Sequence, residues 1–194
     1  YKPAASAGKR VQALCEAKNH ALVMEDCVLE RSVAGIVNST YGCAGQRCMA
    51  LPVVCVQESI ADKFIELFKK KALELKLGAA YLPESQLGPL ASKGQQESVE
   101  AAIARGVAEG ATLVLDGRNP KVDGCENGYF VGPTIFDNVK PEHSVGNDEI
   151  FGPVTCIKRF KTEDDAIGIA NDTVYGLSSY LWTENTGRML RVAK

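Results

Sequence analysis

The sequence predicts an α/β domain in three layers, in which helices cover both faces of a largely parallel sheet. Short apolar runs with β-branched residues alternate along the 194 residues with stretches whose apolar side chains recur at helical spacing. The composition is that of a globular protein, since 45% of the residues are hydrophobic and 24% are charged. A net charge of −2 gives no electrostatic reason to expect nucleic acid or an acidic membrane as a partner. No apolar stretch approaches the roughly 20 residues of a membrane span.

The strands are expected from short apolar runs bounded by turn residues. The first ten residues are expected to be the end of a helix or a link into the first strand. The expected strands cover residues 11–14, 21–24, 52–56, 112–115, 154–160 and 177–182, with further strand-like runs in 129–139. The last of these regions is interrupted by Gly132 and Pro133.

The helices are expected from capping residues at their starts, apolar side chains on one face and glycines at their ends. The expected helices cover residues 31–41, 59–78, 92–110 and 184–194, with one more that begins at Thr162. The expected caps are Ser59 with Asp62, Ser92, and Thr162 with Asp165, and the terminating glycines are Gly78 and Gly110. The side chains expected to face inward are Ile60, Phe64, Leu67, Phe68, Val99, Ala102, Ile103, Val107, Ala166, Ile169 and Ala170.

The cysteines indicate a reducing environment more than a disulfide framework. There are seven, at positions 15, 27, 43, 48, 55, 125 and 156, and their count is odd and their spacing irregular. None forms the C-x-x-C spacing of a structural metal site, so no metal ligand is predicted. We interpret most of these thiols, Cys43 among them, as core-filling side chains of a protein from a reducing compartment. A cysteine protease would need a histidine partner, and neither His20 nor His143 has a supporting local signature.

The segment with the clearest chemistry is residues 41–50, Tyr-Gly-Cys-Ala-Gly-Gln-Arg-Cys-Met-Ala. It places Cys48 after a glycine-bearing turn and next to Arg47, directly before an apolar run. A free thiol, with a pKa of ~8.5, is a poor nucleophile at neutral pH unless its surroundings favour the thiolate. Arg47 and the backbone N–H groups of a turn or helix start would supply that bias. Cys48 is therefore a candidate covalent catalyst, with a buried structural thiol as the alternative.

Several motifs in order resemble the aldehyde dehydrogenase superfamily. Residues 45–50 resemble its nucleophile motif, and residues 149–154, Glu-Ile-Phe-Gly-Pro-Val, resemble its second signature. Residues 87–90, 129–134 and 175–177 match further family segments in the expected order. The resemblance covers essentially the whole chain. It implies an aldehyde-dehydrogenase-like catalytic domain of the α/β class, from an oxidoreductase that uses NAD.

Within the superfamily, the chain looks like the methylmalonate-semialdehyde dehydrogenases, the CoA-acylating branch. The segments that carry this likeness are Lys-Asn-His at residues 18–20 and, again, residues 45–50. Hydrolytic members carry a glutamate, the base that activates water, four residues before the lysine matched here by Lys18. This chain has Leu14 there, which fits an acyl group that leaves on a thiol. Glu16 would lie on the same face of an extended segment as Leu14, so a substitute role for it stays open.

The resemblance implies a reaction and a role for each site residue. Cys48 attacks the aldehyde carbon of methylmalonate semialdehyde or malonate semialdehyde, and its backbone N–H supports the oxyanion. Hydride passes to NAD, which leaves a thioester on Cys48. Coenzyme A takes the acyl group and carbon dioxide is lost, giving propionyl-CoA or acetyl-CoA. Arg47 is implied to bind the substrate carboxylate, with a structural ion pair as the alternative. Glu149 is implied to bind the nicotinamide ribose, and Phe151 to lie beside the nicotinamide.

The resemblance also divides the chain. Residues 1–17 are implied to be the tail end of the NAD-binding domain, and residues 18–194 the catalytic domain, truncated at its C-terminal end. We therefore expect a fragment of a longer enzyme that is inactive by itself. The parent is implied to be a homotetramer or homodimer that acts on a small-molecule aldehyde, without a nucleic acid or membrane partner. It would be cytoplasmic in a bacterium and in the mitochondrial matrix in a eukaryote.

Two alternatives stay open at this point. One is another aldehyde dehydrogenase, hydrolytic or acting on a different substrate such as succinate semialdehyde. The other is a non-catalytic structural or binding protein with the same fold, which the three site residues in matching motifs argue against. Lys18, Asn19 and His20 are interpreted as structural in either case.

Overall fold

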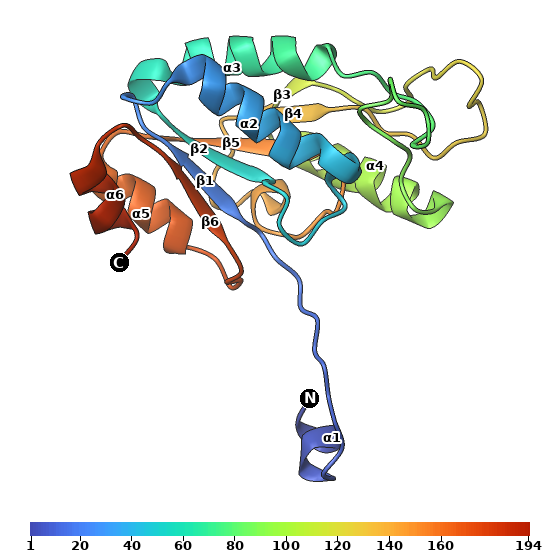
Figure 1. Ribbon diagram of the computed structural model, residues 1–194, viewed down its shortest axis with the longest axis horizontal. Coiled ribbons are helices and arrows are strands. Elements are labelled where there is room, and N and C mark those ends of the chain that lie inside the picture. The colour runs from blue at the N-terminus through green and yellow to red at the C-terminus, as the bar shows by residue number, and fades with distance from the viewer.

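The computed structural model describes all of residues 1–194, and a six-stranded sheet forms its centre (Figure 1). The strands are β1 (His20–Val23), β2 (Val53–Gln57), β3 (Thr112–Leu115), β4 (Thr134–Asp137), β5 (Val154–Phe160) and β6 (Ser179–Trp182). Their order across the sheet is β3-β4-β5-β2-β1-β6, and each neighbouring pair is parallel except β3 with β4. The predicted α/β class with a largely parallel sheet is confirmed.

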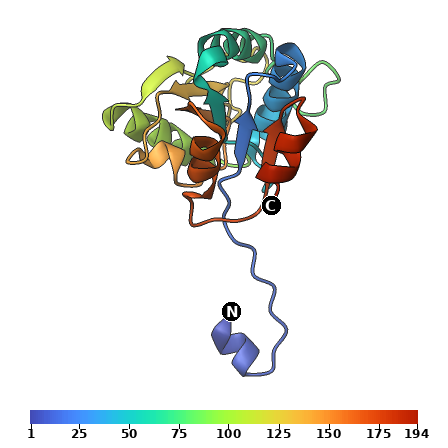
Figure 2. The same ribbon diagram turned by 90° about the vertical axis from the view of Figure 1, so that its left-hand side faces the viewer.

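Helices cover both faces of this sheet (Figure 1, Figure 2). One face carries α2 (Leu29–Tyr41) and α3 (Glu58–Leu73), and the other carries α4 (Lys93–Ala108), the short 3-10 helix η2 (Ser144–Gly146) and α5 (Glu163–Asn171). Successive side chains of a strand point to opposite faces. On β5, Thr155 Oγ1 accordingly donates to Tyr41 Oη of α2 at 3.0 Å, whereas Cys156 Sγ donates to the Val145 carbonyl of η2 at 3.0 Å. The three predicted layers are present.

The central strands are buried on both sides. Every residue of β1 and β4 is buried, as is every residue of β2 except Gln57. This is expected of parallel strands that have helices on both faces. From α3, Phe64 and Phe68 stack at a ring-centroid distance of 5.5 Å, and Phe68 meets Tyr41 of α2 at 5.8 Å. Burial of each phenylalanine stabilises the fold by about 1.5–3 kcal/mol.

Two of the three predicted helix caps are confirmed. Ser92 Oγ accepts a hydrogen bond from the Gln95 N–H at 3.1 Å at the start of α4. Thr162 and Asp165 form a reciprocal capping box at the start of α5. In α4 the expected inward position of Val107 is wrong, because Val107 is 44% exposed and Gly106 is buried instead.

The predicted cap of α3 is wrong. The helix begins at Glu58, without a side-chain cap, and ends at Leu73 rather than at Gly78. Ser59 Oγ donates to the carboxylate of Glu25 at 2.7 Å, and Asp62 pairs with Arg159 of β5 at 2.8 Å. Both side chains thus bind partners that lie far away in the sequence instead of capping their own helix.

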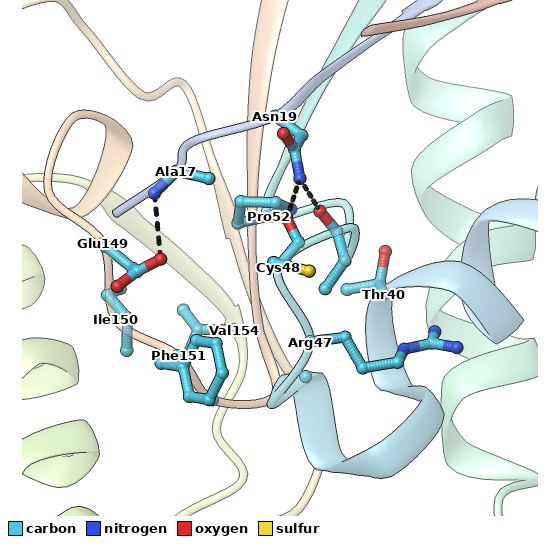
Figure 3. Close-up of a pocket in the computed structure, with 13 residues that line it drawn as sticks. Ala17, Asn19, Thr40, Arg47, Cys48, Pro52, Glu149, Ile150, Phe151 and Val154 are labelled. Atoms are coloured by element: carbon cyan, nitrogen blue, oxygen red, sulfur yellow. Dashed lines mark hydrogen bonds between the residues drawn. The ribbon is translucent and has the colours of Figure 1, made fainter. Parts of the chain in front are cut away.

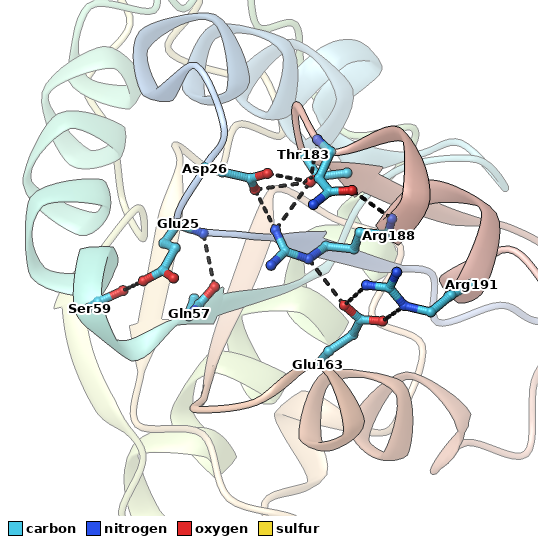
Figure 4. A network of polar contacts seen from close by, with 9 residues as sticks. Glu25, Asp26, Gln57, Ser59, Glu163, Thr183, Arg188 and Arg191 are labelled. Carbon is cyan, nitrogen blue, oxygen red and sulfur yellow. Dashed lines mark hydrogen bonds and ion pairs between the residues drawn. The ribbon is translucent and has the colours of Figure 1, made fainter.

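The last helix, α6 (Thr186–Val192), is attached by charged side chains and has no fully buried residue. Arg188 contacts Asp26 at 2.7 Å and Glu163 at 3.2 Å, and Arg191 reaches Glu163 at 2.8 Å (Figure 4). Partly exposed ion pairs contribute about 0–1 kcal/mol each. The network therefore orients α6 against the start of α5 more than it stabilises the domain.

The N-terminal segment extends away from the sheet (Figure 1, Figure 2). Helix α1 (Lys2–Ser6) has no buried residue, and residues 9–19 have no regular secondary structure. The predicted strand at residues 11–14 is therefore wrong, because no neighbouring strand lies beside it to complete a ladder. Leu14 is 87% exposed. The assignment of residues 1–17 to a cofactor domain stays a prediction.

The cysteines are less buried than expected. Only Cys55 and Cys156 are buried, whereas Cys15, Cys43 and Cys48 are exposed. The expectation that most thiols fill the core is wrong, and so is the interpretation of Cys43 as a core thiol. None of the helices has both the length and the hydrophobicity needed to span a lipid bilayer.

Candidate active site

The motif segments of the sequence meet beyond the amino ends of the parallel strands. Five strands run in the same direction, so the segments that precede them reach the same edge of the sheet. These segments are residues 17–19, 45–52, 129–133, 149–153 and 175–178. Residues from the first, second and fourth segments, together with Thr40 of α2, line a pocket that contains Cys48 (Figure 3). The sequence placed these motifs in order along the chain, and the fold brings them to one place.

Cys48 lies on a turn and is accessible. The Ala50 N–H donates to the Arg47 carbonyl at 3.0 Å, which closes a turn with Cys48 at its first central position. The thiol is exposed, and the Cys48 N–H has no acceptor within the chain. The predicted alternative of a buried structural thiol is therefore wrong. Of the two backbone environments that the sequence suggested, a turn or a helix start, the structure has the turn.

Three side chains hold the backbone carbonyls of this turn. Asn19 Nδ2 donates to the carbonyls of Cys48 at 2.8 Å and Ala50 at 2.7 Å. Tyr180 Oη donates to the Met49 carbonyl at 3.1 Å. Directly after the turn, the Leu51 carbonyl accepts a hydrogen bond from Thr40 Oγ1 at 2.9 Å. Four consecutive carbonyls, from residue 48 to residue 51, are thus bonded to side chains from β6, from α2 and from the residue before β1.

The backbone that leads into the Cys48 turn is closely packed and requires a glycine at position 45. Cys43 and Ala44, in the 3-10 helix η1 (Gly42–Gly45), have φ values of 53°, and Gly45 follows at 70°. A Cβ atom on Gly45 would lie 2.5 Å from the Gly152 carbonyl carbon and closer still to its oxygen. The backbone of the nucleophile motif therefore packs directly on that of the second signature. This contact explains the glycine at position 45, whereas a Cβ on Gly152 would instead lie 2.6 Å from a methyl group of Val99 in α4.

Arg47 points away from the thiol (Figure 3). Its Nη2 donates to the carbonyls of Asn38 at 3.0 Å and Ser39 at 2.8 Å, near the end of α2. Cations at the last carbonyls of a helix interact favourably with the helix dipole. The guanidinium forms no ion pair, so the alternative of a structural ion pair is not what the structure shows. Arg47 still lines the Cys48 pocket, and its predicted contact with a substrate carboxylate stays a prediction.

Glu149 lies across the pocket from Cys48 and is held at one oxygen. Its Oε1 accepts from the Ala17 N–H at 3.0 Å, while Oε2 accepts no hydrogen bond from the chain. Lys18 holds the same loop, because its Nζ donates to the carbonyls of Val145 at 2.9 Å and Asp148 at 2.6 Å. Burial lowers the pKa of Lys18. The structural role expected for Lys18 matches these contacts.

Phe151 stands at the rim of the pocket in a strained conformation. Its φ is 55°, a left-handed value that is rare for a bulky residue, and the residue is 40% exposed. Gln95 Nε2 holds this segment by donating to the carbonyls of Ile150 at 3.1 Å and Phe151 at 2.9 Å. Strained residues of this kind occur preferentially at ligand-binding and catalytic sites.

Glu16 is engaged outside the pocket. Its Oε2 accepts a hydrogen bond from Tyr175 Oη at 2.9 Å, and this bond raises the pKa of Tyr175. Leu14, two residues earlier, is exposed and has no chemistry to offer as a base. Neither residue lines the Cys48 pocket.

Two buried titratable groups, His20 and Cys55, are neutral at neutral pH. Burial lowers the pKa of His20 to about 4, and His20 Nδ1 bonds the Lys18 carbonyl at 2.8 Å. Burial also raises the pKa of Cys55 to about 12, so that thiol is inert at neutral pH. Among the cysteines near the sheet, Cys48 differs from Cys55 and Cys156 by its exposure.

Sequence reasoning missed the residues that support the site. Thr40, Gln95 and Tyr180 belong to no motif, and their contacts reach backbone groups far away in the sequence. No sequence signal marks these three residues, because a polar side chain within a helix or strand is ordinary. Only the fold identifies their partners.

Together these features define an α/β protein that presents an accessible cysteine, on a turn with a free N–H, to a pocket shared with a carboxylate and an exposed aromatic ring. The chain belongs to the aldehyde dehydrogenase family, whose family model matches residues 1–194. The resemblance seen in the motifs is confirmed.

Several relatives that are similar in sequence to this chain are malonate-semialdehyde dehydrogenases. The malonate-semialdehyde dehydrogenase of Bacillus cytotoxicus is 43% identical over 185 residues, which cover 95% of this chain and 38% of the relative. Malonate-semialdehyde dehydrogenase 1 of Bacillus anthracis has the same identity and coverage. The chain thus spans 38% of the length of these relatives.

Solved structures share the fold throughout. The methylmalonate-semialdehyde dehydrogenase of Oceanimonas doudoroffii superposes with a TM-score of 0.95 at 36% identity, covering 100% of this chain and 40% of that one. The betaine aldehyde dehydrogenase of Staphylococcus aureus, in complex with NAD+, superposes with a TM-score of 0.95 at 32% identity. The matched region covers 99% of this chain and 38% of the betaine aldehyde dehydrogenase chain. The fold is therefore common to enzymes named for different aldehydes.

Proposed function

We propose that the full-length protein containing this chain oxidises methylmalonate semialdehyde and malonate semialdehyde, with NAD as hydride acceptor and coenzyme A as acyl acceptor. The observation that carries the proposal is Cys48, an exposed thiol on a clamped turn whose own N–H is free. The names of the 43% identical relatives support the substrate class.

In this proposal Cys48 does the covalent chemistry. Its thiolate attacks the aldehyde carbon, and the free Cys48 N–H donates to the oxyanion that develops there. When bound, NAD accepts the hydride that leaves this carbon. The acyl group then remains on Cys48 as a thioester until the thiolate of coenzyme A displaces it. The substrate carboxylate leaves as carbon dioxide, and a proton replaces it on the α-carbon. Over the whole reaction the aldehyde carbon is oxidised and NAD is reduced.

The residues present fit a nicotinamide riboside at the pocket. Glu149 Oε2 is free to accept from a ribose hydroxyl, because only Oε1 is engaged within the chain. Phe151, two residues further along the chain, offers a partly exposed ring. Its backbone is held in place by the hydrogen bond from Gln95 to the Phe151 carbonyl. These two residues would hold the ribose and the ring. Within residues 1–194, Glu149 and Phe151 are the two residues to which we assign cofactor contacts.

Transfer to coenzyme A is favoured over hydrolysis by what the site lacks. A hydrolytic enzyme needs a base close to the thioester to activate water. At the position where hydrolytic members of the family carry their glutamate, this chain has Leu14. The nearby Glu16 is hydrogen-bonded to Tyr175 at 2.9 Å. Glu149 is the one carboxylate that lines the pocket. An external thiol is the acceptor that needs no such base.

The test is product analysis with the full-length protein. Each semialdehyde is supplied with NAD, with and without coenzyme A, and NADH is followed by absorbance and the products by mass spectrometry. We expect propionyl-CoA from methylmalonate semialdehyde only when coenzyme A is present, and no NADH from the Cys48→Ser variant. Free acid formed at the same rate without coenzyme A would refute the acylating reaction and favour a hydrolytic enzyme.

A substrate panel and a labelling control complete this test. Faster turnover of succinate semialdehyde would refute the substrate class and leave the family intact. Iodoacetamide should label Cys48 in the native protein long before Cys55, and peptide mass spectrometry distinguishes the two. A Cys48 that resists labelling would favour a non-catalytic protein. The isolated 194-residue chain is expected to form no NADH, since it spans only 38% of its relatives.

A further inference from the structure

Asn19 is buried, and both ends of its side-chain amide are in use. Only 4% of the residue is exposed. The two N–H groups of its amide serve the carbonyls of Cys48 and Ala50, and its Oδ1 accepts from the Ser178 N–H at 3.2 Å. An amide has two donor hydrogens and one acceptor oxygen, so no donor remains for another partner. Asn19 therefore joins three segments, which lie before β1, before β2 and before β6.

These contacts fix the backbone at Cys48 itself. Each residue has only two soft backbone dihedrals, and the flanking peptide planes define them. The plane before Cys48 is held because the Arg47 carbonyl accepts from the Ala50 N–H. The plane after it is held because the Cys48 carbonyl accepts from Asn19. The directions of the Cys48 N–H and of its Cα–Cβ bond follow from these two planes.

We infer that Asn19 is a positioning residue for the thiol reaction, which rests on the proposed role of Cys48 as nucleophile. It aims the Cys48 N–H and side chain by clamping the turn, and it does not touch the substrate. Displacements of about 1 Å at a reacting centre cost on the order of 100-fold in rate. Tyr180 and Thr40 hold the neighbouring carbonyls of Met49 and Leu51, so loss of Asn19 should loosen the turn without unfolding it.

Two substitutions separate the contributions of hydrogen bonding and charge. Asn19→Ala removes all three hydrogen bonds and introduces no charge. Asn19→Asp keeps the shape but replaces the donors by a carboxylate that faces two carbonyl oxygens and lies beside the thiol turn. The matched control is Thr162→Ala, which removes a cap at the start of α5, beyond the carboxyl end of β5. All three variants and Cys48→Ser are made in the full-length protein.

The readouts are kcat, KM and the alkylation of Cys48. For Asn19→Ala we expect kcat per folded molecule to fall about 10–100-fold while KM stays within about 3-fold of its original value. Asn19→Asp should lower kcat further and move the pH profile of iodoacetamide labelling at Cys48 to higher pH, because a negative charge disfavours the thiolate. Thr162→Ala should lower the melting temperature and leave kcat and the labelling profile unchanged.

Two outcomes would overturn the inference. One is an Asn19→Ala variant whose kcat per folded molecule stays within about 3-fold of the Thr162→Ala control. The other is an Asn19→Asp labelling profile that matches that of the unchanged protein. The proposed function would be refuted by a different result, NADH formation by the Cys48→Ser variant. The Asn19 variants therefore test the positioning role, and the Cys48 variant separately tests the nucleophile.

Discussion

Replacement of Gly45 by alanine is expected to destabilise the fold by about 2–5 kcal/mol. One part is conformational, because the φ of 70° costs a residue with a Cβ about 1–2 kcal/mol. The other part is steric, because the new Cβ would lie 2.5 Å from the Gly152 carbonyl carbon, and both neighbours are backbone. Forced repacking of this kind costs about 1–3 kcal/mol. The two terms together give the expected range.

Two other glycines serve as controls that separate these terms. Gly110 also has a positive φ, 95°, but a Cβ there would meet nothing within 4 Å. Gly110→Ala should therefore cost only the conformational term, about 1–2 kcal/mol. Gly168 lies inside α5, without a positive φ and with nothing within 4 Å of a Cβ. Gly168→Ala should stabilise the helix by up to about 1 kcal/mol.

The assay is urea unfolding followed by the fluorescence of Trp182, the only tryptophan in the chain. With a slope of about 1–3 kcal/mol per molar urea, Gly45→Ala should lower the midpoint by roughly 1 M or more. The ranking should be Gly168→Ala above the unchanged chain, then Gly110→Ala, then Gly45→Ala. If Gly45→Ala and Gly110→Ala unfold with the same free energy, the contact with Gly152 contributes nothing and the steric reasoning is refuted.

Three further substitutions test a buried histidine and an ion pair with a buried carboxylate. Burial lowers the pKa of His20 from 6.5 to about 4, so between these pH values the unfolded chain binds a proton that the folded chain does not. The free energy of unfolding should therefore fall by up to about 3 kcal/mol as the pH drops from 6.5 to 4, and His20→Gln should flatten this dependence in urea titrations across that range. Arg159→Met leaves the buried carboxylate of Asp137, paired at 2.7 Å, without its cation and should cost about 2–4 kcal/mol. Asp62→Asn removes an exposed partner of the same arginine and should change stability by less than about 0.5 kcal/mol, so equal costs for the two would contradict this account.

The position of the site departs from the usual arrangement. In open α/β sheets, ligands generally bind beyond the carboxyl ends of the strands. Here the candidate site lies beyond the amino ends, where Cys48, Glu149 and Phe151 precede β2 and β5. The carboxyl ends carry instead the ion pairs of Arg188 with Asp26 and Glu163. The order of the motifs along the chain does not show at which edge of the sheet they meet.

Local physics allowed much of the fold to be predicted from the sequence. The capping box of Thr162 and Asp165 needs only residues within one turn, and it is present as predicted. The strand at residues 154–160 needs only a run of apolar residues between turn signals, and β5 has those bounds. Where a local pattern had no partner, as at residues 11–14, the same reasoning was wrong. A strand requires a neighbour, and the sequence does not show whether one is present.

By itself, the sequence determined the family, the α/β class and the identity of Cys48 as the candidate nucleophile, because these depend on ordered motifs and short-range patterns. Only the tertiary structure decided what each polar side chain does. Asn19 meets residues 29, 31 and 159 positions away, and Arg47 turns to the carbonyls of α2 instead of lying beside the thiol. The reason is physical: a hydrogen bond forms with whichever group the packed helices and strands bring within about 3 Å, and for residues far apart in the sequence the spacing carries no information about that distance.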